Sequence, residues 1–418
     1  MSPRAAKTAD NTIGWDVGFP LVVFAWHWVI IQSAAVLSGW IGGVNAPSPP
    51  YGRMPDPMTG LAHTMVEPFR NWDGLWYSLI AQTGYVGGTE SAKAAFWPLF
   101  PWLMQAGSTI TGLAPETVGY LIANISFAFA LIVIYRLVRL DFTDRVARRT
   151  LWALALFPTA LFFQAVYTES LFLVLAASTL LFARTNRWWL AGFIGILAAL
   201  TRSYGVLLAL PMLVLFWQQR GCDLRRWWPQ GVAIAMPAIG PAIFGWHLHR
   251  VQGNAKAFVD VQAQWDRYTA TPWQTLRCAA FGCGFYRESD GASWDRLWEA
   301  LGDPSRYVDP AWRLRFGNSD ILELCCTILF LALALIGLWK LPLWMSAFTI
   351  PGLIIPLFSP SKVHALMSMP RFGLVLFPLF VVLALILRPS WFARALMALS
   401  TILLFLLTLQ FAQWYWVS

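Results

Sequence analysis

Charged residues are scarce in this sequence. Only 12% of its 418 residues are Asp, Glu, Lys or Arg, whereas an ordinary soluble domain carries about 25%. Hydrophobic residues make up 58% of the chain, and the mean hydropathy is +0.55. A soluble domain of this composition would expose large apolar patches and aggregate. The shortage of charge therefore excludes a soluble globular protein and indicates a polytopic membrane protein.

Several common functional motifs are also absent. No glycine-rich phosphate-binding loop occurs in the predicted cytoplasmic segments, so nucleotide-driven transport has no support. The five Cys and five His are scattered without metal-ligand spacing, and we predict no zinc site and no other cofactor. No cleavable signal peptide is evident, and the first apolar run, from about Phe19, is expected to be retained as a span.

The excess of basic residues does not indicate a nucleic-acid partner. Lys and Arg number 30 against 21 Asp and Glu, which gives a net charge of +9. These basic residues are spread over short segments between apolar runs, which is the pattern that membrane topology imposes. We therefore expect membrane lipids, and no nucleic acid, as partners.

The apolar runs predict an all-α bundle of about 11 transmembrane helices in a single membrane domain. Several runs are shorter than the roughly 20 residues of a straight span, so 151–184 and 188–217 each allow another division. The expected spans lie near 19–41, 117–140, 151–165, 170–184, 188–201, 205–217, 231–248, 321–339, 342–358, 372–387 and 395–416.

Basic residues orient these spans. With a cytoplasmic N-terminus, most basic residues of the short segments fall on the cytoplasmic side, as the positive-inside rule requires. The C-terminus is then extracytoplasmic. The cytoplasmic set is Arg4, Lys7, Arg136, Arg139, Arg145, Arg148, Arg149, Arg184, Arg187, Arg220, Arg225, Arg226, Lys340, Arg388 and Arg394.

Two long extracytoplasmic segments, 42–116 and 249–320, hold most of the remaining polar residues. The first begins rich in Pro and Gly, and its prolines at 94–103 predict a broken segment at the membrane interface. The second is expected to be a lid with short helices around 255–268 and 292–301. Cys278 and Cys283 of this lid form either a disulfide or two reduced thiols.

The stretch "NWDGLWYSLIAQTGY" at 71–85 predicts a short amphipathic helix. Asn71 is the expected cap and Gly84 the expected end. Asp73 in its first turn is either a helix-start acid or a catalytic group. The apolar face comprises Trp72, Leu75, Trp76, Leu79 and Ile80.

Three cations break the charge rule in short outer connections. Arg202, Lys362 and Arg371 lie where a basic residue is unexpected. Each needs a partner, which is either a nearby carboxylate or carbonyl group or an anionic substrate such as a phosphate.

Motifs along nearly the whole chain resemble the GPI mannosyltransferase II (PIG-V) family in its shorter bacterial form, whose members are GT-C type glycosyltransferases. The most specific are the WD-containing helix, the YTES turn and the TRS-x-G turn. The matching stretches are "NWDGLWYSLIAQTGY" at 71–85, "AFWPLFP" at 95–101, "LFPTALFFQAVYTESLF" at 156–172, "LAALTRSYGVLLALP" at 197–211, "VQAQWDRYTATPW" at 261–273, "SMPRFGLVLFPLF" at 368–380 and "FAQWYWVS" at 411–418.

The resemblance implies a polyprenyl-phosphate sugar donor, with mannose the expected sugar, and a lipid-linked or glycolipid hydroxyl acceptor on the extracytoplasmic face. The essential acid of the family maps onto Asp73, and its outer turns map onto Glu169, Arg202 and Arg371. The sequence departs from the family at Phe372 and Gly373, where a Tyr and a bulkier apolar residue are expected. Short loops and the lack of an outer Asn-x-Ser/Thr site favour a bacterial plasma membrane.

A mechanism consistent with these residues is a single inverting displacement. Asp73 would act as general base, and Arg202, Lys362 and Arg371 would stabilise the phosphate leaving group. His364 could donate a hydrogen bond there. Trp72 and Tyr167 of the matching motifs are further candidates for substrate binding.

Some candidates also have a simpler structural interpretation. Glu169, next to Thr168, could merely start a helix. Lys93, a further substrate-binding candidate, could extend its ammonium group to the membrane surface while its alkyl chain stays in apolar surroundings.

The alternative function is transport of a polyprenyl-phosphate sugar across the bilayer. A transporter needs ionisable groups or broken helices near the middle of the membrane, whereas the polar residues here gather toward the outer face. A catalytically inactive assembly subunit is a third possibility, against which the retained Asp73 argues. The sequence predicts no oligomeric state and does not identify the acceptor.

Overall fold

Helices make up nearly all of the fold. The computed structural model describes residues 16–41, 57–86, 92–221, 230–282, 319–387 and 390–417. Within these ranges the single β-type contact is an isolated antiparallel bridge between Arg267 and Ser361. The predicted all-α architecture is therefore confirmed for the described part of the chain.

Five helical segments of the described ranges are long and apolar enough to cross a bilayer. α5 illustrates why such a segment is helical at both ends. It starts with Pro115, whose fixed φ suits a first helical position, and it has Glu116 in its first turn and Arg136 and Arg139 in its last, which match the helix dipole. The five segments are α1 (Gly18–Ile41), α5 (Pro115–Arg139), the run of α10 (Gln230–Ala235), η6 (Met236–Ala238) and α11 (Ile239–Gln252), α15 (Ser319–Lys340) and α19 (Trp391–Ala412).

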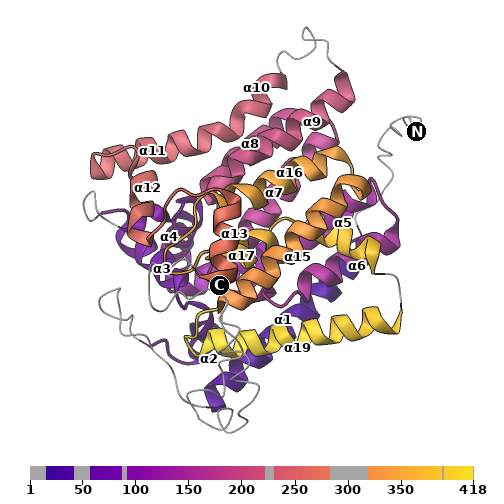
Figure 1. The fold of residues 1–418 in the computed structure, drawn as a ribbon. Coiled ribbons are helices and arrows are strands. Elements are labelled where there is room, and N and C mark those ends of the chain that lie inside the picture. Colours follow the sequence, from indigo (N-terminus) through magenta and orange to yellow (C-terminus); the bar gives the residue numbers. More distant parts are fainter. Residues whose placement is uncertain are drawn as a thin grey trace.

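Shorter helices complete the bundle. In Figure 1, α1 and α19 lie side by side along one edge, and α5, α7 and α8 pack in succession through the centre. The shorter helices are α6 (Asp144–Ala155), α7 (Glu169–Arg184), α8 (Trp188–Thr201), α9 (Ala209–Arg220), α16 (Leu343–Leu357), α17 (Met369–Leu374) and α18 (Pro378–Ile386).

Two of the predicted spans are interrupted by non-helical residues. Residues 151–165 are the end of α6 followed by the 3-10 turn η3 (Ala160–Phe163), and residues 372–387 are divided between α17 and α18. A proline lies at each break, Pro158 and Pro378, and lacks the N–H that a continuing helix needs. The count of about 11 spans is therefore not confirmed, although the multi-helix bundle is.

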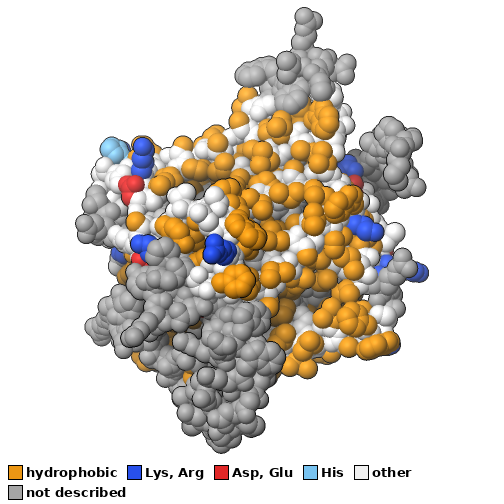
Figure 2. Space-filling view, viewed as in Figure 1, with side chains coloured by type: hydrophobic (Ala, Val, Ile, Leu, Met, Phe, Trp, Pro, Cys, Tyr) orange, Lys and Arg blue, Asp and Glu red, His pale blue; other side chains and the backbone are white. Residues whose placement is uncertain are grey.

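The flank of the bundle is apolar. In Figure 2, hydrophobic side chains cover most of the described surface over α9, α15 and α16, and charged side chains lie mostly toward the two ends. Large exposed side chains on this flank include Leu335 and Leu343. Such a surface is suited to lipid rather than to water.

The first long segment that is predicted to be extracytoplasmic, 42–116, is largely helical where it is described. The prediction of a broken stretch at 94–103 is only partly correct, because a regular helix begins at Leu99. Pro101 is tolerated there because it lies in the first turn, where its missing N–H breaks no intrahelical bond. The elements are α2 (Leu61–Met65), η1 (Glu67–Phe69), α3 (Asp73–Thr83), η2 (Ala92–Ala95) and α4 (Leu99–Thr111).

The second long outer segment contains α12 (Ala257–Asp260), η7 (Val261–Trp265) and α13 (Pro272–Phe281). The first two confirm the helix predicted around 255–268. The helix predicted around 292–301 lies outside the described residues. Cys283 lies outside them too, so neither alternative for Cys278 and Cys283, a disulfide or two reduced thiols, is tested.

Sequence analysis missed α13, although its start signal is present in the sequence. Thr271 and Gln274 form a capping box, in which the Thr271 hydroxyl accepts from the Gln274 N–H at 3.3 Å and the Gln274 side chain accepts from the Thr271 N–H at 2.9 Å. Two orphan N–H groups are satisfied in this way.

The ends of α7 and α8 separate two groups of charges. Glu169 begins α7 and Arg184 ends it, while Arg187 precedes α8 and Arg202 follows it. The 16 residues of α7 span about 24 Å. The cations predicted as cytoplasmic thus lie at the other end of these helices from the candidate site residues. Which end faces the cytoplasm stays a prediction.

Candidate active site

Helix α3 brings Asp73 to the polar end of the bundle. Gly84, with φ of 65°, ends this helix as predicted. Trp72 has φ of 57°, so the chain turns sharply just before Asp73. The cap predicted at Asn71 is wrong, because the Asn71 amide donates instead to the carbonyl oxygen of Phe411 at 2.8 Å.

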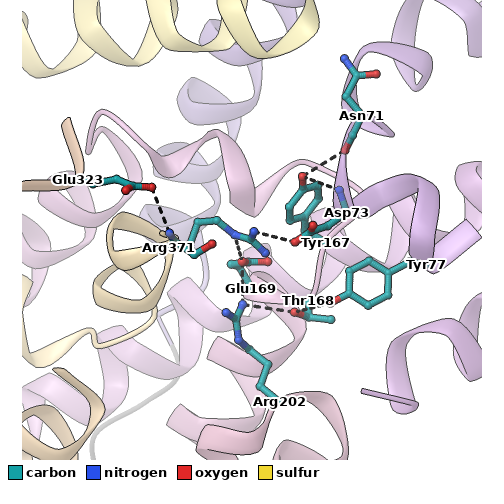
Figure 3. Close-up of polar contacts among 10 residues, drawn as sticks. Asn71, Asp73, Tyr77, Tyr167, Thr168, Glu169, Arg202, Glu323 and Arg371 are labelled. Carbon is teal, nitrogen blue, oxygen red and sulfur yellow. Dashed lines mark hydrogen bonds and ion pairs between the residues drawn. The ribbon is translucent and has the colours of Figure 1, made fainter. Parts of the chain in front are cut away.

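Four charged side chains from distant parts of the sequence form one series of ion pairs (Figure 3). Arg371 Nη1 lies 2.7 Å from Asp73 Oδ2, and Arg371 Nε lies 2.8 Å from Glu169 Oε1. Arg202 Nη1 lies 2.7 Å from the same Glu169 oxygen. The Glu169 side chain has no exposed surface. The structure thus brings together four predicted site residues, two of them 298 positions apart.

Helix ends determine where these charges lie. Asp73 and Glu169 are the first residues of α3 and α7, where the helix dipole favours a carboxylate. Arg202 follows α8 in an extended conformation and precedes the 3-10 helix η4 (Ser203–Leu208). A Cβ at Gly205 would lie 2.2 Å from the Ala199 nitrogen, so the TRS-x-G motif needs its glycine for η4 to pack on α8.

Tyr167 joins the start of α3 to the ion pairs. Its hydroxyl accepts a hydrogen bond from the Asp73 N–H at 3.2 Å and donates one to the Asn71 carbonyl at 3.1 Å. The Arg371 guanidinium lies 4.7 Å from the centre of the Tyr167 ring. Burial and the charge of Asp73 raise the pKa of Tyr167. This predicted site residue therefore stays neutral and fixes the turn that carries Asp73.

A cavity of about 380 Å³ opens beside these charges, a size within the usual range for small-ligand sites. Its lining combines cations with aromatic rings, which suits an anionic ligand that carries a sugar. The polar lining includes Asp73, Thr168, Arg202, Arg267, Ser368 and Arg371, and the aromatic lining includes Tyr77, Phe96, Tyr204, Trp265, Phe372 and Trp416. Among the described residues no group of three His, Cys, Asp or Glu side chains is placed to hold a metal ion.

Arg267 is a cationic lining residue that the sequence analysis missed. It follows η7, and its Nη1 donates to the Ser359 carbonyl oxygen at 2.7 Å. The signal was the motif at 261–273, in which Arg267 lies. It was overlooked because the charge rule does not govern long outer segments, so no basic residue there stood out as unexpected.

The departure from the family at Phe372 and Gly373 has a local explanation. A Cβ at Gly373 would lie 2.1 Å from the ring of Phe330. Phe330 therefore occupies the space that a bulkier residue at 373 would take. Phe372 lines the cavity, and the Arg202 guanidinium lies 5.5 Å from the centre of its ring.

Lys93 and Trp72 do not belong to the cavity lining. The Lys93 ammonium group donates to the Thr83 hydroxyl at 2.9 Å and to the Gly84 carbonyl at 3.2 Å, so it binds the C-terminal end of α3. Trp72 packs edge-on against Trp416, with ring centres 5.2 Å apart. It thereby supports a ring that does line the cavity.

Lys362 and His364 are likewise absent from the cavity lining. The Lys362 N–H donates to the Asp266 carbonyl at 2.9 Å, and His364 Nδ1 lies 2.8 Å from Asp320 Oδ1. Burial lowers the pKa of His364, but the hydrogen bond to Asp320 and the charge of Glu323 outweigh burial, so the pKa is raised overall.

Comparison with known families and structures agrees with this fold. Residues 93–244, less than half of the chain, match the family described as dolichyl-phosphate-mannose-protein mannosyltransferase. No curated protein matches the chain.

The solved structures that are similar include ArnT from Cupriavidus metallidurans bound to undecaprenyl phosphate, with 14% identity, a TM-score of 0.50 and coverage of 92% of this chain and 63% of that one. ArnT in the apo state has 14% identity and a TM-score of 0.50, with coverage of 91% of this chain and 62% of that one. A third structure is the oligosaccharyltransferase AglB from Archaeoglobus fulgidus in complex with an inhibitory peptide and a dolichol-phosphate. It has 15% identity and a TM-score of 0.48, with coverage of 95% of this chain and 56% of that one.

The chain thus spans less than two thirds of the length of these proteins. It shares the fold of ArnT over nearly all of its own length. With five helical segments of the described residues long and apolar enough to cross a bilayer, the shared fold supports a multi-pass membrane protein.

Proposed function

We propose that this protein is an inverting glycosyltransferase that moves mannose from a polyprenyl-phosphate-mannose donor to a hydroxyl group of a lipid-linked or glycolipid acceptor. The reaction would take place on the extracytoplasmic face of a bacterial plasma membrane. The observation that carries this proposal is the cavity that places the Asp73 carboxylate beside guanidinium groups from distant segments. The ArnT fold and the matched mannosyltransferase family support it.

Asp73 is the general base of the proposed reaction. Its carboxylate lines the cavity, and its side chain retains 19% exposure. Within the described residues its side-chain partner is Arg371, through Oδ2, which leaves Oδ1 to accept a proton from the acceptor hydroxyl. The ion pair orients the carboxylate, and proton transfer to a positioned base is a common source of rate enhancement.

The guanidinium groups of the cavity lining stabilise the leaving group. As the sugar departs, negative charge builds up on the lipid phosphate, and guanidinium groups lining the cavity, Arg202 and Arg371 among them, stabilise it. A single displacement by one hydroxyl inverts the anomeric carbon, so a β-linked donor gives an α-linked product. The acceptor proton goes to Asp73, and the polyprenyl phosphate leaves with the bonding electrons.

No observation favours the transporter over the enzyme. Glu169, Arg202 and Arg371 are buried at the polar end that also contains Asp73, rather than halfway along the long helices. An alternating-access transporter would need such groups near the middle of the membrane. We therefore keep transport only as an outcome of the test.

The test is transfer of label from radiolabelled polyprenyl-phosphate mannose to lipid in an extract of the source organism, catalysed by the purified protein. We expect a new labelled lipid whose formation depends on the protein, and product analysis gives both the acceptor and the anomeric configuration. Parallel donors that carry glucose or an amino sugar test the sugar. Transfer from only one of these donors would identify its sugar, instead of mannose, as the one transferred. Movement of labelled donor across the membrane of vesicles that contain the protein, with no labelled product formed, would favour transport.

A further inference from the structure

Arg267 contacts no carboxylate of the described residues, and the charges of Glu323 and Asp73 act on it only from a distance. Arg202 and Arg371 each lie within 2.8 Å of a carboxylate oxygen. Arg267 forms no ion pair with a carboxylate of the described residues, and its side-chain hydrogen bond goes to the neutral carbonyl of Ser359 at 2.7 Å. Burial lowers the pKa of Arg267. Arg267 is half-buried, and a guanidinium group that lines a cavity without a contacting carboxylate is placed to bind an anion.

The backbone around Arg267 is held in one place. Its segment pairs with residues 359–362 through the antiparallel bridge at Ser361. On either side of the bridge, the Tyr268 N–H donates to the Pro360 carbonyl at 3.0 Å and the Lys362 N–H donates to a carbonyl of the Arg267 segment at 2.9 Å. Pairing of the two segments holds the backbone, and the bond to the Ser359 carbonyl directs the guanidinium before any ligand arrives, which reduces the entropy cost of binding.

Among the groups that line the cavity or belong to the ion-pair series, three guanidinium groups face two carboxylates. Two carboxylates, those of Asp73 and Glu169, face the guanidinium groups of Arg202 and Arg371 in the ion-pair series. Arg267 lines the same cavity outside that series. A phosphodiester that links a sugar to a lipid carries one negative charge, which matches this excess, and an arginine fork suits phosphate oxygens.

We infer that Arg267 binds the phosphate of the lipid donor, while Arg202 and Arg371 chiefly hold Asp73 and Glu169 in place. This inference rests on the proposed function. It shifts the main phosphate contact away from the cations expected from the sequence, Arg202, Lys362 and Arg371, to a residue of the second outer segment. Donor affinity then depends on Arg267, and the orientation of Asp73 depends on Arg371.

The experiment measures binding of undecaprenyl phosphate to the full chain in detergent. Arg267→Gln should weaken binding by about tenfold to a hundredfold, because a charge-assisted contact to phosphate is lost. Arg277→Gln is the matched control, since Arg277 is an exposed arginine of α13 in the same outer segment, and it should bind as wild type does. An affinity of Arg267→Gln within about twofold of wild type would overturn the inference.

Two further ligands separate the phosphate from other sources of affinity. Undecaprenol, which has the tail without the phosphate, should bind wild type and Arg267→Gln equally weakly. An equal loss of both lipids in the variant would contradict a phosphate contact. Inorganic phosphate should compete with undecaprenyl phosphate on wild type only at much higher concentration, and equal affinity for the two would show a free-anion site instead of a lipid-phosphate site.

If Arg267→Gln does not fold, Arg267→Lys tests whether Arg267 binds the phosphate. Lysine keeps the charge but not the bidentate fork, so affinity for undecaprenyl phosphate should fall about threefold to tenfold while affinity for undecaprenol stays unchanged. Unchanged affinity for both lipids would overturn the inference.

The inference and the proposed function fail separately. If undecaprenyl phosphate binds in a way that depends on Arg267 but no acceptor is glycosylated, the proposed enzymatic activity is wrong and the phosphate site is supported. If Arg267→Gln transfers sugar with an unchanged KM for the donor, the proposed activity is supported and the role of Arg267 in phosphate binding is wrong.

Discussion

At the scale of single residues, Glu169 holds the site together. One of its carboxylate oxygens, Oε1, contacts both Arg202 and Arg371 at 2.7 and 2.8 Å. Among the described residues Oε2 has no hydrogen-bond partner. Two guanidinium groups, one of which orients Asp73, thus depend on a single buried oxygen.

Glu169→Gln should therefore lower both stability and transfer. The variant leaves two buried cations facing one carboxylate, and breaking a buried ion pair costs about 3–5 kcal/mol in the free energy of unfolding. Transfer should fall as well, because Arg371 loses the contact that positions it against Asp73. Thermal unfolding in detergent and the transfer assay measure the two effects.

Glu116→Gln is the control for this prediction. Glu116 is also a buried acid in the first turn of a helix, but within the described residues its partner is the Gln82 amide, at 3.4 Å, rather than a cation. Its replacement should cost much less. Equal losses of stability in the two variants would mean that the ion pairs around Glu169 contribute nothing of their own.

At the scale of elements, the packing of α17 against α15 sets the position of Arg371. α17 is only six residues long, and Gly373 lets it approach Phe330 of α15 closely. Overpacking a tight contact of this kind usually costs about 1–3 kcal/mol.

Gly373→Ala should lower the free energy of unfolding by about that amount and reduce transfer, because α17 must shift and Arg371 with it. Gly373→Ala combined with Phe330→Leu should recover part of both losses, since the two changes relieve one contact. Gly39→Ala in α1, where nothing lies within 4 Å of the new Cβ, should be nearly neutral. A double variant no better than Gly373→Ala would refute steric conflict with Phe330.

The connection from α16 to α17 should be sensitive to pH through His364. Asp320 and Glu323 face this imidazole from α15, the Trp416 ring stacks on it at 6.4 Å, and its pKa is raised above the ordinary value of 6.5. A raised pKa in the folded state adds stability that is fully present below about pH 6.5 and is lost as pH rises through the folded-state pKa.

Wild type should then exceed His364→Gln in unfolding free energy by about 1 kcal/mol at low pH, with the difference shrinking at higher pH. Thermal unfolding of both proteins across this range checks the trend. A difference that stays constant with pH would show that protonated His364 has no special role.

The sequence predicted local elements better than contacts between them. Periodicity and a closing glycine were enough to find α3, and the family motifs were enough to gather Asp73, Glu169 and Arg371 into one site. The pairing of the Arg267 segment with residues 359–362 joins loops about ninety positions apart and leaves no periodic signal. For the same reason Asn71 was expected to cap its own helix, although it bonds to Phe411 across the bundle.

At the scale of the whole molecule, an apolar flank lies between two charged ends, and the end at which α3 begins is the polar end that carries the candidate site. The flank matches a lipid environment (Figure 2), and the polar end collects the ion pairs and the cavity. An ion pair of similar geometry, Asp141 with Arg184 at 2.8 Å, lies at the other end of α7. The molecule therefore provides an internal comparison between a structural aspartate and the aspartate assigned to catalysis.

The most direct test of the account compares Asp73→Asn with Asp141→Asn in two assays on the same preparations, transfer from labelled polyprenyl-phosphate mannose and binding of undecaprenyl phosphate. We expect Asp73→Asn to lose transfer by at least about a hundredfold, since general-base catalysis contributes roughly that much, while it still binds the lipid phosphate. Asp141→Asn should retain both activities. Transfer by Asp73→Asn at a rate close to that of wild type would contradict the assignment of Asp73 as the base, and with it the central claim.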